Sequence, residues 1–296
     1  MILAAPGPNR SGLSHMPQRL PLLIRTALAA ERIRRTVEHL HALFWDEVLW
    51  AWTRPPQREA INQIIWGRRT GYLPGGFTFG TGLSDWERRA ITEPPFPKSG
   101  RILLGGAGGG RELVPLCRRG FDVVAFEPSE LCEGARQAIT SFPNSTVVRA
   151  SYRDLVTAAQ EHTGPLAPHV LDAPFDAVLF GWQSFDYVFA QSDRHDLLCA
   201  TRTIAPKAPL LLSFWMVQGA ENGKLDRLRP PIRQICKLLG SPSVRCPGEV
   251  FWPWAGFMRH LVSQNELEAA ANGSGYRILY FRPSLASYPH AMLMPQ

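Results

Sequence analysis

Short apolar runs alternate with helical patterns over the last two thirds of the chain. Each run is short enough and apolar enough to be a strand buried on both faces, which is typical of a parallel sheet. Seven such runs occur, at 102–104, 121–126, 145–149, 175–181, 209–215, 276–282 and 291–294. The last two are joined by a short connection, so one strand must be antiparallel. The sequence therefore predicts an α/β fold with a seven-stranded, mostly parallel, doubly wound sheet and an antiparallel last strand.

The front third of the chain has a helical pattern and carries no strand signal. Between about residues 20 and 52, Ile33, Val37, Leu40 and Phe44 recur at spacings of three and four residues, which indicates one apolar helix face. Further helical segments follow before the first predicted strand. We therefore expect an N-terminal helical layer over the mouth of the α/β domain, where substrate pockets form.

A loop rich in glycine and aromatic residues, at 71–80, interrupts the helical layer. Its side chains Tyr72, Phe77 and Phe79 have two possible roles. They either line a substrate pocket or pack the layer against the sheet, and the sequence leaves both readings open.

These patterns divide the chain into three parts. Residues 1–19 carry Pro, Gly, Ser and Asn and no acid, which predicts a flexible tail. Residues 20–95 form the predicted helical cap, and residues 96–296 form the α/β domain. Within that domain, 216–250 is punctuated by Pro and Gly and is expected to be an insertion at the edge of the sheet.

Composition places the chain among ordinary soluble proteins. Of its 296 residues, 45% are hydrophobic and 19% are charged. No run of eighteen apolar residues occurs, so the sequence predicts no membrane partner. The five cysteines are scattered without a C-x-x-C spacing, which favours reduced thiols, a cytoplasmic location and no metal site. The oligomeric state is left open.

A net charge of +7 raises the possibility of a nucleic-acid partner. The arginines, however, come in short pairs such as Arg34-Arg35 and Arg68-Arg69. No long basic run or recognisable nucleic-acid module occurs. Nucleic acid is therefore an unlikely partner.

The chemistry of the chain centres on the turn after the first predicted strand. Gly105 to Gly110 are all glycine or alanine, and the second strand ends on Glu127. Glycines allow a ligand to approach the backbone, the following helix offers free N–H groups, and a carboxylate at the end of the next strand can bind ribose hydroxyls. Read as G-x-A-x-x-G, the turn fits a dinucleotide site, so an NAD(P)-dependent oxidoreductase remains an alternative.

Read as G-x-G-x-G-R-E, the same turn resembles motif I of the class I S-adenosylmethionine-dependent methyltransferases, which have a Rossmann-like fold. The resemblance covers about residues 84–296. Most members carry an acid two residues before the first motif glycine, where this chain has Leu104. The resemblance implies S-adenosyl-L-methionine as the cofactor, and it places the cofactor-binding residues at the ends of the first four strands. They are Gly106, Ala107, Gly108, Gly110, Glu112, Glu127, Pro128, Ser151, Tyr152, Gly181 and Trp182.

The resemblance gives two of these positions, Ser151 and Trp182, a specific expected role. In the family, a polar residue after the third strand meets the adenine. Ser151 aligns best with that place, and Asp154 is the nearest acid, although Asp154 also fits the first turn of a helix. Trp182 follows the fourth strand, beside the expected sulfonium, where an aromatic face suits a cation.

A neutral acceptor must lose a proton, and the candidates for a general base are His260, Asp186 and Tyr187. The resemblance implies a methyltransferase that acts on a small organic molecule by in-line O- or N-methylation. No Asn-Pro-Pro-Tyr-like tetrapeptide follows the fourth strand, which disfavours amino groups of nucleic acids. RNA, a protein or a peptide as the acceptor remains an alternative, as does a non-catalytic scaffold that binds the cofactor.

Overall fold

The computed structural model describes residues 21–217, 226–243, 245–284 and 288–296. The predicted tail at 1–19 lies outside these residues. Among the described helices, none combines the length and the apolar character needed to cross a membrane.

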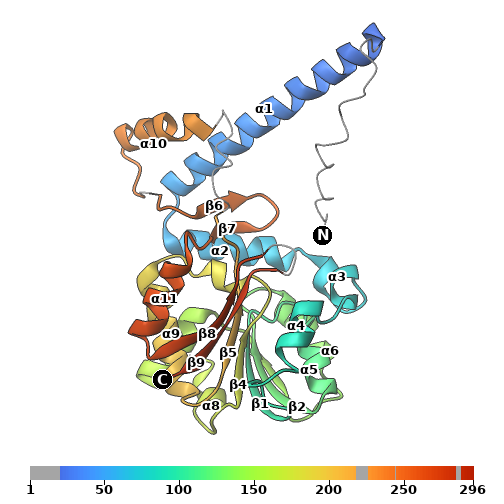
Figure 1. Ribbon diagram of the computed structural model, residues 1–296, viewed down its shortest axis with the longest axis vertical. Coiled ribbons are helices and arrows are strands. Elements are labelled where there is room, and N and C mark those ends of the chain that lie inside the picture. Colours follow the sequence, from blue (N-terminus) through green and yellow to red (C-terminus); the bar gives the residue numbers. More distant parts are fainter. Residues whose placement is uncertain (1–20, 218–225, 244, 285–287) are drawn as a thin grey trace.

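One seven-stranded sheet organises the molecule (Figure 1). Its strand order is β3-β2-β1-β4-β5-β9-β8, and every neighbouring pair is parallel except the two pairs that involve β9. The expected antiparallel last strand is thereby confirmed. The strands are β1 (Gly100–Gly105), β2 (Phe121–Phe126), β3 (Thr146–Val148), β4 (Ala177–Phe180), β5 (Leu210–Ser213), β8 (Tyr276–Arg282) and β9 (His290–Pro295).

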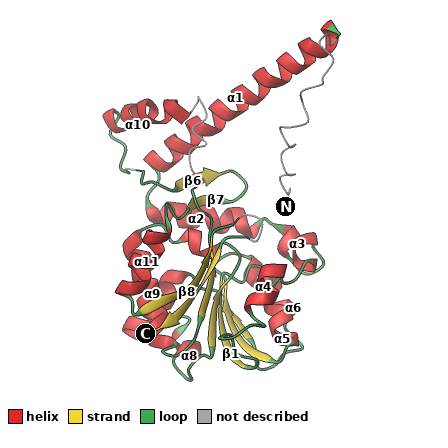
Figure 2. Cartoon of the chain, viewed as in Figure 1, coloured by secondary structure: helices red, strands yellow, loops and turns green. Residues whose placement is uncertain are grey.

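Helices cover both faces of this sheet, which makes it doubly wound (Figure 2). One face packs against α4 (Asp85–Ala90), α5 (Leu113–Arg118) and α6 (Leu131–Ala138). The other packs against α7 (Tyr152–Glu161), α8 (Ala167–Val170), α9 (Gln191–Ile204) and α11 (Gln264–Gly273). The central strands β1, β4 and β5 are apolar on both faces because both faces are covered.

Helix capping follows the sequence at one position and departs from it at another. Ser84 and Glu87 form the expected capping box at the start of α4. Ser263 and Glu266 have the same spacing at the start of α11, but no box forms there. The carboxylate of Glu266 instead accepts hydrogen bonds from Arg194, Arg259 and the amide of Val262, so it is not free to cap the helix.

The front of the chain forms α1 (Leu22–Trp52), α2 (Pro55–Gly67), the 3₁₀ turn η2 (Thr70–Tyr72) and α3 (Phe77–Gly80). Figure 1 shows α2 above one end of the sheet, as expected for a layer over the mouth of the domain. The same figure shows the first half of α1 running away from the body of the molecule. Ile33 and Val37, which mark the apolar face of this helix, are exposed to solvent.

A second, two-stranded sheet was not expected from the sequence. Strands β6 (Glu249–Trp252) and β7 (Gly256–Arg259) pair antiparallel and stand between α1 and α2. The segments η4 (Asp226–Leu228) and α10 (Arg229–Leu238) lie in the predicted insertion at 216–250, and β6 begins at its end. The sequence around these two strands is rich in Trp, Pro and Gly and shows no alternation of apolar and polar residues from which a strand could be recognised.

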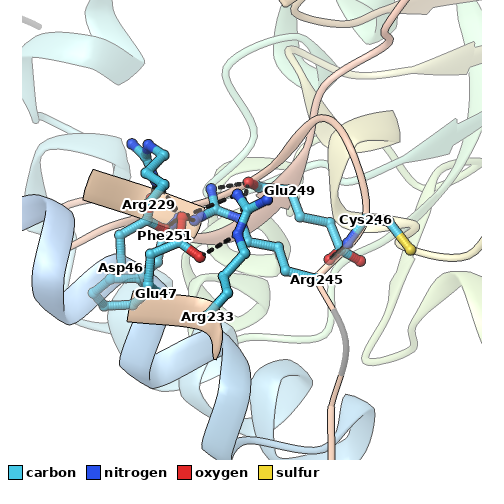
Figure 3. A network of polar contacts seen from close by, with 8 residues as sticks. All are labelled: Asp46, Glu47, Arg229, Arg233, Arg245, Cys246, Glu249 and Phe251. Carbon is cyan, nitrogen blue, oxygen red and sulfur yellow. Dashed lines mark hydrogen bonds and ion pairs between the residues drawn. The ribbon is translucent and has the colours of Figure 1, made fainter. Parts of the chain in front are cut away.

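A buried ion-pair network holds these parts together (Figure 3). Asp46 and Glu47 are buried in the second half of α1. Arg229 and Arg233 of α10 reach them at 2.6 Å, to Asp46 Oδ2 and Glu47 Oε2 respectively. Arg245 donates to both carboxylates, at 2.8 and 2.6 Å. The two acids therefore join α1, α10 and the segment that leads into β6.

This network makes stability depend on pH. Burial opposes the charged form of Glu47, but its bonds to Arg233, Arg245 and Arg229 outweigh burial and lower its pKa below the ordinary 4.5. A lowered pKa stabilises the fold above the unfolded-state pKa, and that contribution is lost as the pH falls through the folded-state value.

We expect Glu47→Gln to lower the free energy of unfolding by about 1.5–3 kcal/mol above about pH 5. The difference from the wild type should shrink as the pH falls from the ordinary pKa of 4.5 through the lowered pKa of Glu47, where the wild-type side chain takes up a proton. Urea unfolding across this pH range measures it. Glu38→Gln, at an exposed position of the same helix, is the matched control. A difference that did not change with pH would contradict the assignment.

The helical layer also contacts the glycine turn directly. A Cβ at Gly109 would lie 2.0 Å from the carbonyl oxygen of Tyr72, and one at Gly134 would lie 2.5 Å from Leu73 Cδ2. No side chain at position 109 tolerates such a distance to a backbone oxygen, whereas Gly134 faces the end of a leucine side chain. Gly109 is therefore required for the front loop to reach the domain, and Gly134 leaves the room that the Leu73 side chain occupies.

Candidate functional site

A large cavity lies between the carboxyl ends of β1, β2 and β4 and the helical layer. Its volume is about 1570 Å³. Pockets for a single small ligand commonly measure about 300–1,000 Å³, so this cavity has room for two. Its walls come from the glycine turn, α2, the β6–β7 hairpin and the start of α9.

The glycine turn forms one wall of the cavity. Gly106, Ala107 and Gly108 line it. Gly108 has a φ of +53°, and a Cβ placed there would have only Tyr72 and Leu131 within 4 Å, at 3.8 Å or more. The space above Gly108 is therefore open. Gly110 differs, because a Cβ on it would face Ala135 at 3.5 Å, so it serves the packing of α6 and does not line the cavity.

Glu127 stands beside this turn, directly after β2. Its carboxylate is buried and also lines the cavity. Oε2 accepts a hydrogen bond from the amide of Gly108 at 3.0 Å, and Oε1 accepts from the amide and hydroxyl of Ser129 at 3.0 and 2.5 Å. A carboxylate has about four acceptor positions, so one remains open at Oε2. Burial raises the pKa of Glu127, opposed by the bonds from Ser129 and Gly108.

A buried cluster follows the turn. Arg111 forms a two-pronged ion pair with Glu87 of α4, at 2.9 and 2.5 Å, and also donates to Glu112. Glu112 Oε1 accepts the amide of Trp182 at 3.2 Å, which fixes the loop after β4. The Arg111 guanidinium lies 4.7 Å from the centroid of the Trp182 ring. One face of that ring thus already holds a cation, and a sulfonium would need its other face or its edge.

The end of β3 supplies another wall. Ser151 and Tyr152 line the cavity, whereas Asp154 does not. Ser151 is the N-cap of α7, and Asp154 accepts from its amide and hydroxyl, both at 2.7 Å. Asp154 therefore has the structural role that the sequence left open, that of an acid in the first turn of a helix. The hydroxyl of Tyr152 lies 2.5 Å from Ser184 Oγ, at the floor of the turn.

The structure brings most of the predicted cofactor residues to this cavity. Nine of them line it: Gly106, Ala107, Gly108, Glu112, Glu127, Pro128, Ser151, Tyr152 and Trp182. Gly181 and Gly110 do not. Gly181 instead donates its amide to Gly105 at 2.8 Å and ties the ends of β4 and β1 together.

Of the three predicted substrate residues, only Tyr72 lines the cavity. Phe77 is 74% exposed on the outer side of α3. Phe79 packs against the apolar core under α6, which corresponds to the packing role left open from the sequence. The loop that carries these residues turns back at Gly75 and Gly76, so its later aromatic residues point away from the cavity.

The structure does not bring Asp186 or His260 to the cavity. Asp186 is completely buried and accepts the amide of Trp215 at 2.9 Å, which makes it a support for the loop after β5. His260 is buried in contact with the rings of Trp215 and Trp252. Burial, reinforced by Arg194 and Arg245, lowers the pKa of His260 to about 4. Neither residue is placed to take a proton from an acceptor.

Tyr187, the third candidate base, does line the cavity. Its hydroxyl donates to the carbonyl of Ala255 at 2.9 Å and accepts from Trp66 Nε1 at 2.8 Å. Burial raises the pKa of Tyr187 well above its ordinary value. The residue therefore joins the hairpin turn to α2, and its proton is already engaged.

Sequence reasoning missed most of the wall opposite the glycine turn. This wall is rich in aromatic rings, contributed by α2, the segment after β5, the hairpin and the loop before β9. Its members are Trp66, Trp215, Trp252, Trp254 and Tyr288. The high tryptophan content was visible in the sequence, but the residues are spread over more than 200 positions, and only the fold brings them together.

Comparison with known proteins gives a limited result. No family model matches the chain, and no curated protein matches its sequence. Among solved structures, the glycopeptide N-methyltransferase MtfA complexed with S-adenosyl-L-methionine is 19% identical, with a TM-score of 0.47, over 72% of this chain and 94% of its own. DesVI of Streptomyces venezuelae is 15% identical, with a TM-score of 0.43, over 68% and 85% of the two chains. The CcbJ methyltransferase from Streptomyces caelestis is 14% identical, with a TM-score of 0.45, over 66% and 89%.

Proposed function

We propose that this protein is an S-adenosylmethionine-dependent methyltransferase that methylates oxygen or nitrogen of a small organic acceptor. The observation that carries the proposal is Glu127. A buried carboxylate with an open acceptor position lies at the end of β2, hydrogen-bonded to the glycine turn after β1 and facing the cavity. A nucleoside ribose needs such a partner at this place in a doubly wound sheet.

The residues present fit this cofactor. The open space above Gly108 lets the backbone approach the methionine part, and Ser151 and Tyr152 bound the adenine end. The strand order, with β9 antiparallel between β5 and β8, favours the methyltransferase sheet over the six-stranded parallel dinucleotide fold. When bound, S-adenosylmethionine supplies a methyl group on a sulfonium, which an acceptor attacks in line.

The protein's own contribution is to position two reactants and to exclude water. Arg111 and Glu112 fix the Trp182 loop beside the transfer site, while α2 and the hairpin cover it. The aromatic wall suits a flat, largely apolar acceptor. Because neither Asp186 nor His260 reaches the cavity, we assign no general base to them.

Calorimetric titration tests the cofactor. S-adenosylmethionine and S-adenosylhomocysteine should bind at micromolar concentrations, while NADH and NADPH should not. Binding of the nicotinamide pair alone would replace the proposal with the oxidoreductase reading. If S-adenosylmethionine bound but no S-adenosylhomocysteine formed with any acceptor in a broad screen of phenols, amines and peptides, the protein would be better described as a non-catalytic scaffold that binds the cofactor.

Glu127→Ala should weaken binding of S-adenosylhomocysteine by about 1–3 kcal/mol, because the charged hydrogen bond to the ribose is lost. The same titration measures it. Glu130→Ala, an exposed acid three residues on, is the control and should bind as the wild type does. Equal affinity of the two variants for S-adenosylhomocysteine would show that Glu127 does not bind the ribose.

A further inference from the structure

Seven side chains that line the cavity contact one another in a closed circuit. Neighbouring ring centroids in it lie 5.0–6.3 Å apart. The guanidinium of its one cation lies 5.4 Å from the ring centroid of Trp254 and 6.0 Å from that of Tyr72. In order around the circuit, the members are Arg69, Trp254, Trp252, Trp215, Tyr288, Trp182 and Tyr72. We call these seven residues the aromatic circuit.

The circuit borders the space that we assign to the cofactor. Tyr72 is the residue nearest to the open space above Gly108, at 3.8 Å from a Cβ placed there. Trp182 belongs both to the circuit and to the loop beside the proposed transfer site. A flat molecule held within the circuit would therefore lie next to the methyl group and pack its rings against the aromatic side chains.

Arg69 supplies the circuit with a positive charge that is not neutralised by an acid. Among the described residues, its guanidinium contacts the rings of Trp66, at 4.8 Å from the centroid, Tyr72 and Trp254, and no carboxylate. Burial raises the pKa of Tyr72, against the opposing effect of Arg69, so Tyr72 stays neutral and offers no counter-charge. A guanidinium can stack on aromatic rings and still present its two-pronged N–H fork to a carboxylate.

The other arginines of the cavity wall are already engaged. Arg111, Arg153 and Arg259 form ion pairs with acids, and Arg58 donates to backbone carbonyl oxygens. Within the described part of the chain, Arg69 is therefore the arginine of this wall whose charge is left for a ligand.

Two further members of the circuit have polar hydrogens without an acceptor. Nε1 of Trp215 and the hydroxyl of Tyr288 are buried and form no well-aligned hydrogen bond with any described residue. Trp182 lies beside the Tyr288 hydroxyl, but its indole N–H is itself a donor, so the Tyr288 proton stays without an acceptor. Buried donors are normally paired. Oxygen atoms of a bound molecule are the partners that both donors lack.

The circuit is poorly suited to a positively charged ligand, although aromatic rings often bind cations. A cation, Arg69, already lies against the rings of Trp66 and Trp254. The circuit itself contains no carboxylate. The acids that line the cavity are outside it, namely Glu59, Glu112, Glu127, Asp193, Asp196 and Glu249. An amine would therefore meet a like charge and hydrogen-bond donors, whereas an anion would be attracted by both.

We propose that the aromatic circuit binds the methyl acceptor, and that this acceptor is a flat aromatic acid whose carboxylate pairs with Arg69. The inference rests on the proposed function, because it names the substrate class of that reaction. The ring of the acid lies among the tryptophans, and oxygen substituents on it accept hydrogen bonds from Trp215 and Tyr288. Arg69 is then the residue that determines specificity for an acid.

Calorimetric titration of the complex with S-adenosylhomocysteine tests this. The probes are 2-naphthoate and indole-3-carboxylate, each compared with its methyl ester and with the amine that carries an aminomethyl group in place of the carboxylate. Each acid should bind at least about tenfold more tightly than its ester, which is the effect of one charge-assisted pair. The amines should bind most weakly.

Arg69→Gln separates recognition of the carboxylate from packing of the wall. It should weaken binding of each acid at least about tenfold and leave the affinity for the ester nearly unchanged. Arg69→Lys keeps the charge but lacks the two-pronged fork, so its affinity for the acids should be intermediate. Arg68→Gln removes an exposed charge outside the cavity wall and should bind as the wild type does. S-adenosylhomocysteine should bind equally to the wild type and all three variants, which shows that each is folded.

Three outcomes would overturn the inference alone. The first is that neither acid binds more tightly than its ester, and the second is that the amines bind more tightly than the acids. The third is that Arg69→Gln weakens binding of acid and ester equally, which would make Arg69 a packing residue. Failure of the wild type to bind S-adenosylhomocysteine is a different result, because it would reject the proposed function and the inference with it.

Discussion

Gly108→Val is expected to reduce binding of S-adenosylhomocysteine by a factor of 100 or more. A valine side chain would occupy the open space above the turn, where the structure leaves no atom closer than 3.8 Å to a Cβ. The position also has a φ of +53°, which β-branched residues avoid, so the turn itself would shift. Both effects act on the wall that we assign to the methionine part of the cofactor. Titration calorimetry measures the loss.

A matched glycine separates the ligand effect from backbone strain. Gly120 has a φ of +87°, no atom within 4 Å of a Cβ, and an exposed position outside the cavity. Gly120→Val should therefore cost stability and leave binding intact. If Gly108→Val bound as tightly as Gly120→Val, the open space would not belong to the cofactor.

Arg111→Met is expected to lower the free energy of unfolding by about 3–5 kcal/mol. The substitution leaves the carboxylates of Glu87 and Glu112 buried without their counter-charge, which is the costly way to break a buried ion pair. Burial already raises the pKa of Glu112, opposed by Arg111, so in the variant Glu112 should take up a proton more readily and the loss should shrink as the pH is lowered. Urea unfolding at neutral and acidic pH checks both statements.

Arg88→Met provides the comparison. Arg88 pairs with Asp85 on the exposed side of the same α4 helix. Exposed pairs contribute about 0–1 kcal/mol, so this variant should remain close to the wild type. A similar loss in both variants would mean that the buried cluster contributes no more than a surface pair.

The sheet could be predicted from the sequence because each buried strand carries its own local signal. The run from Phe121 to Phe126 is apolar, short and bounded, and it coincides with β2. The short link between the last two runs indicated the antiparallel strand. The hairpin of β6 and β7 was not predicted from the sequence. Its side chains are divided between the cavity, as for Trp252, and the packing around Trp50, as for Phe257, and they lack the alternation of a half-buried strand.

The wall that we assign to the cofactor could also be predicted from the sequence. The glycine turn and the acid at the end of the next strand lie close together in the chain. Glu127 and Gly108 are only 19 residues apart and meet at 3.0 Å. The aromatic wall, which we propose for the acceptor, could not be predicted in this way. Trp66 and Trp252 come from distant segments, and no local pattern tells an aromatic that lines a cavity from one that fills a core.

Burial also determined which of the candidate general bases could reach the cavity. His260 and Asp186 were attractive as isolated residues near the expected mouth. Whether such a side chain points into a cavity or behind its wall depends on packing between segments, which a single sequence does not encode locally. Ile33 and Val37 illustrate the reverse case, because an apolar helix face predicts that something covers it and does not say what.

The contact of Tyr72 with Gly109 and of Leu73 with Gly134 limits how this protein can be divided or recombined. The front layer and the α/β domain share a surface shaped on both sides, by bare glycine backbone below and by the chain at 72–73 above. A fragment beginning at residue 96 would leave that surface uncovered and would remove the part of the cavity wall that residues 55–86 supply. A front layer grafted from another protein would not fit the same two glycines. Engineering of acceptor choice should therefore proceed by single substitutions along α2 and the hairpin, with Tyr72 and Leu73 left in place.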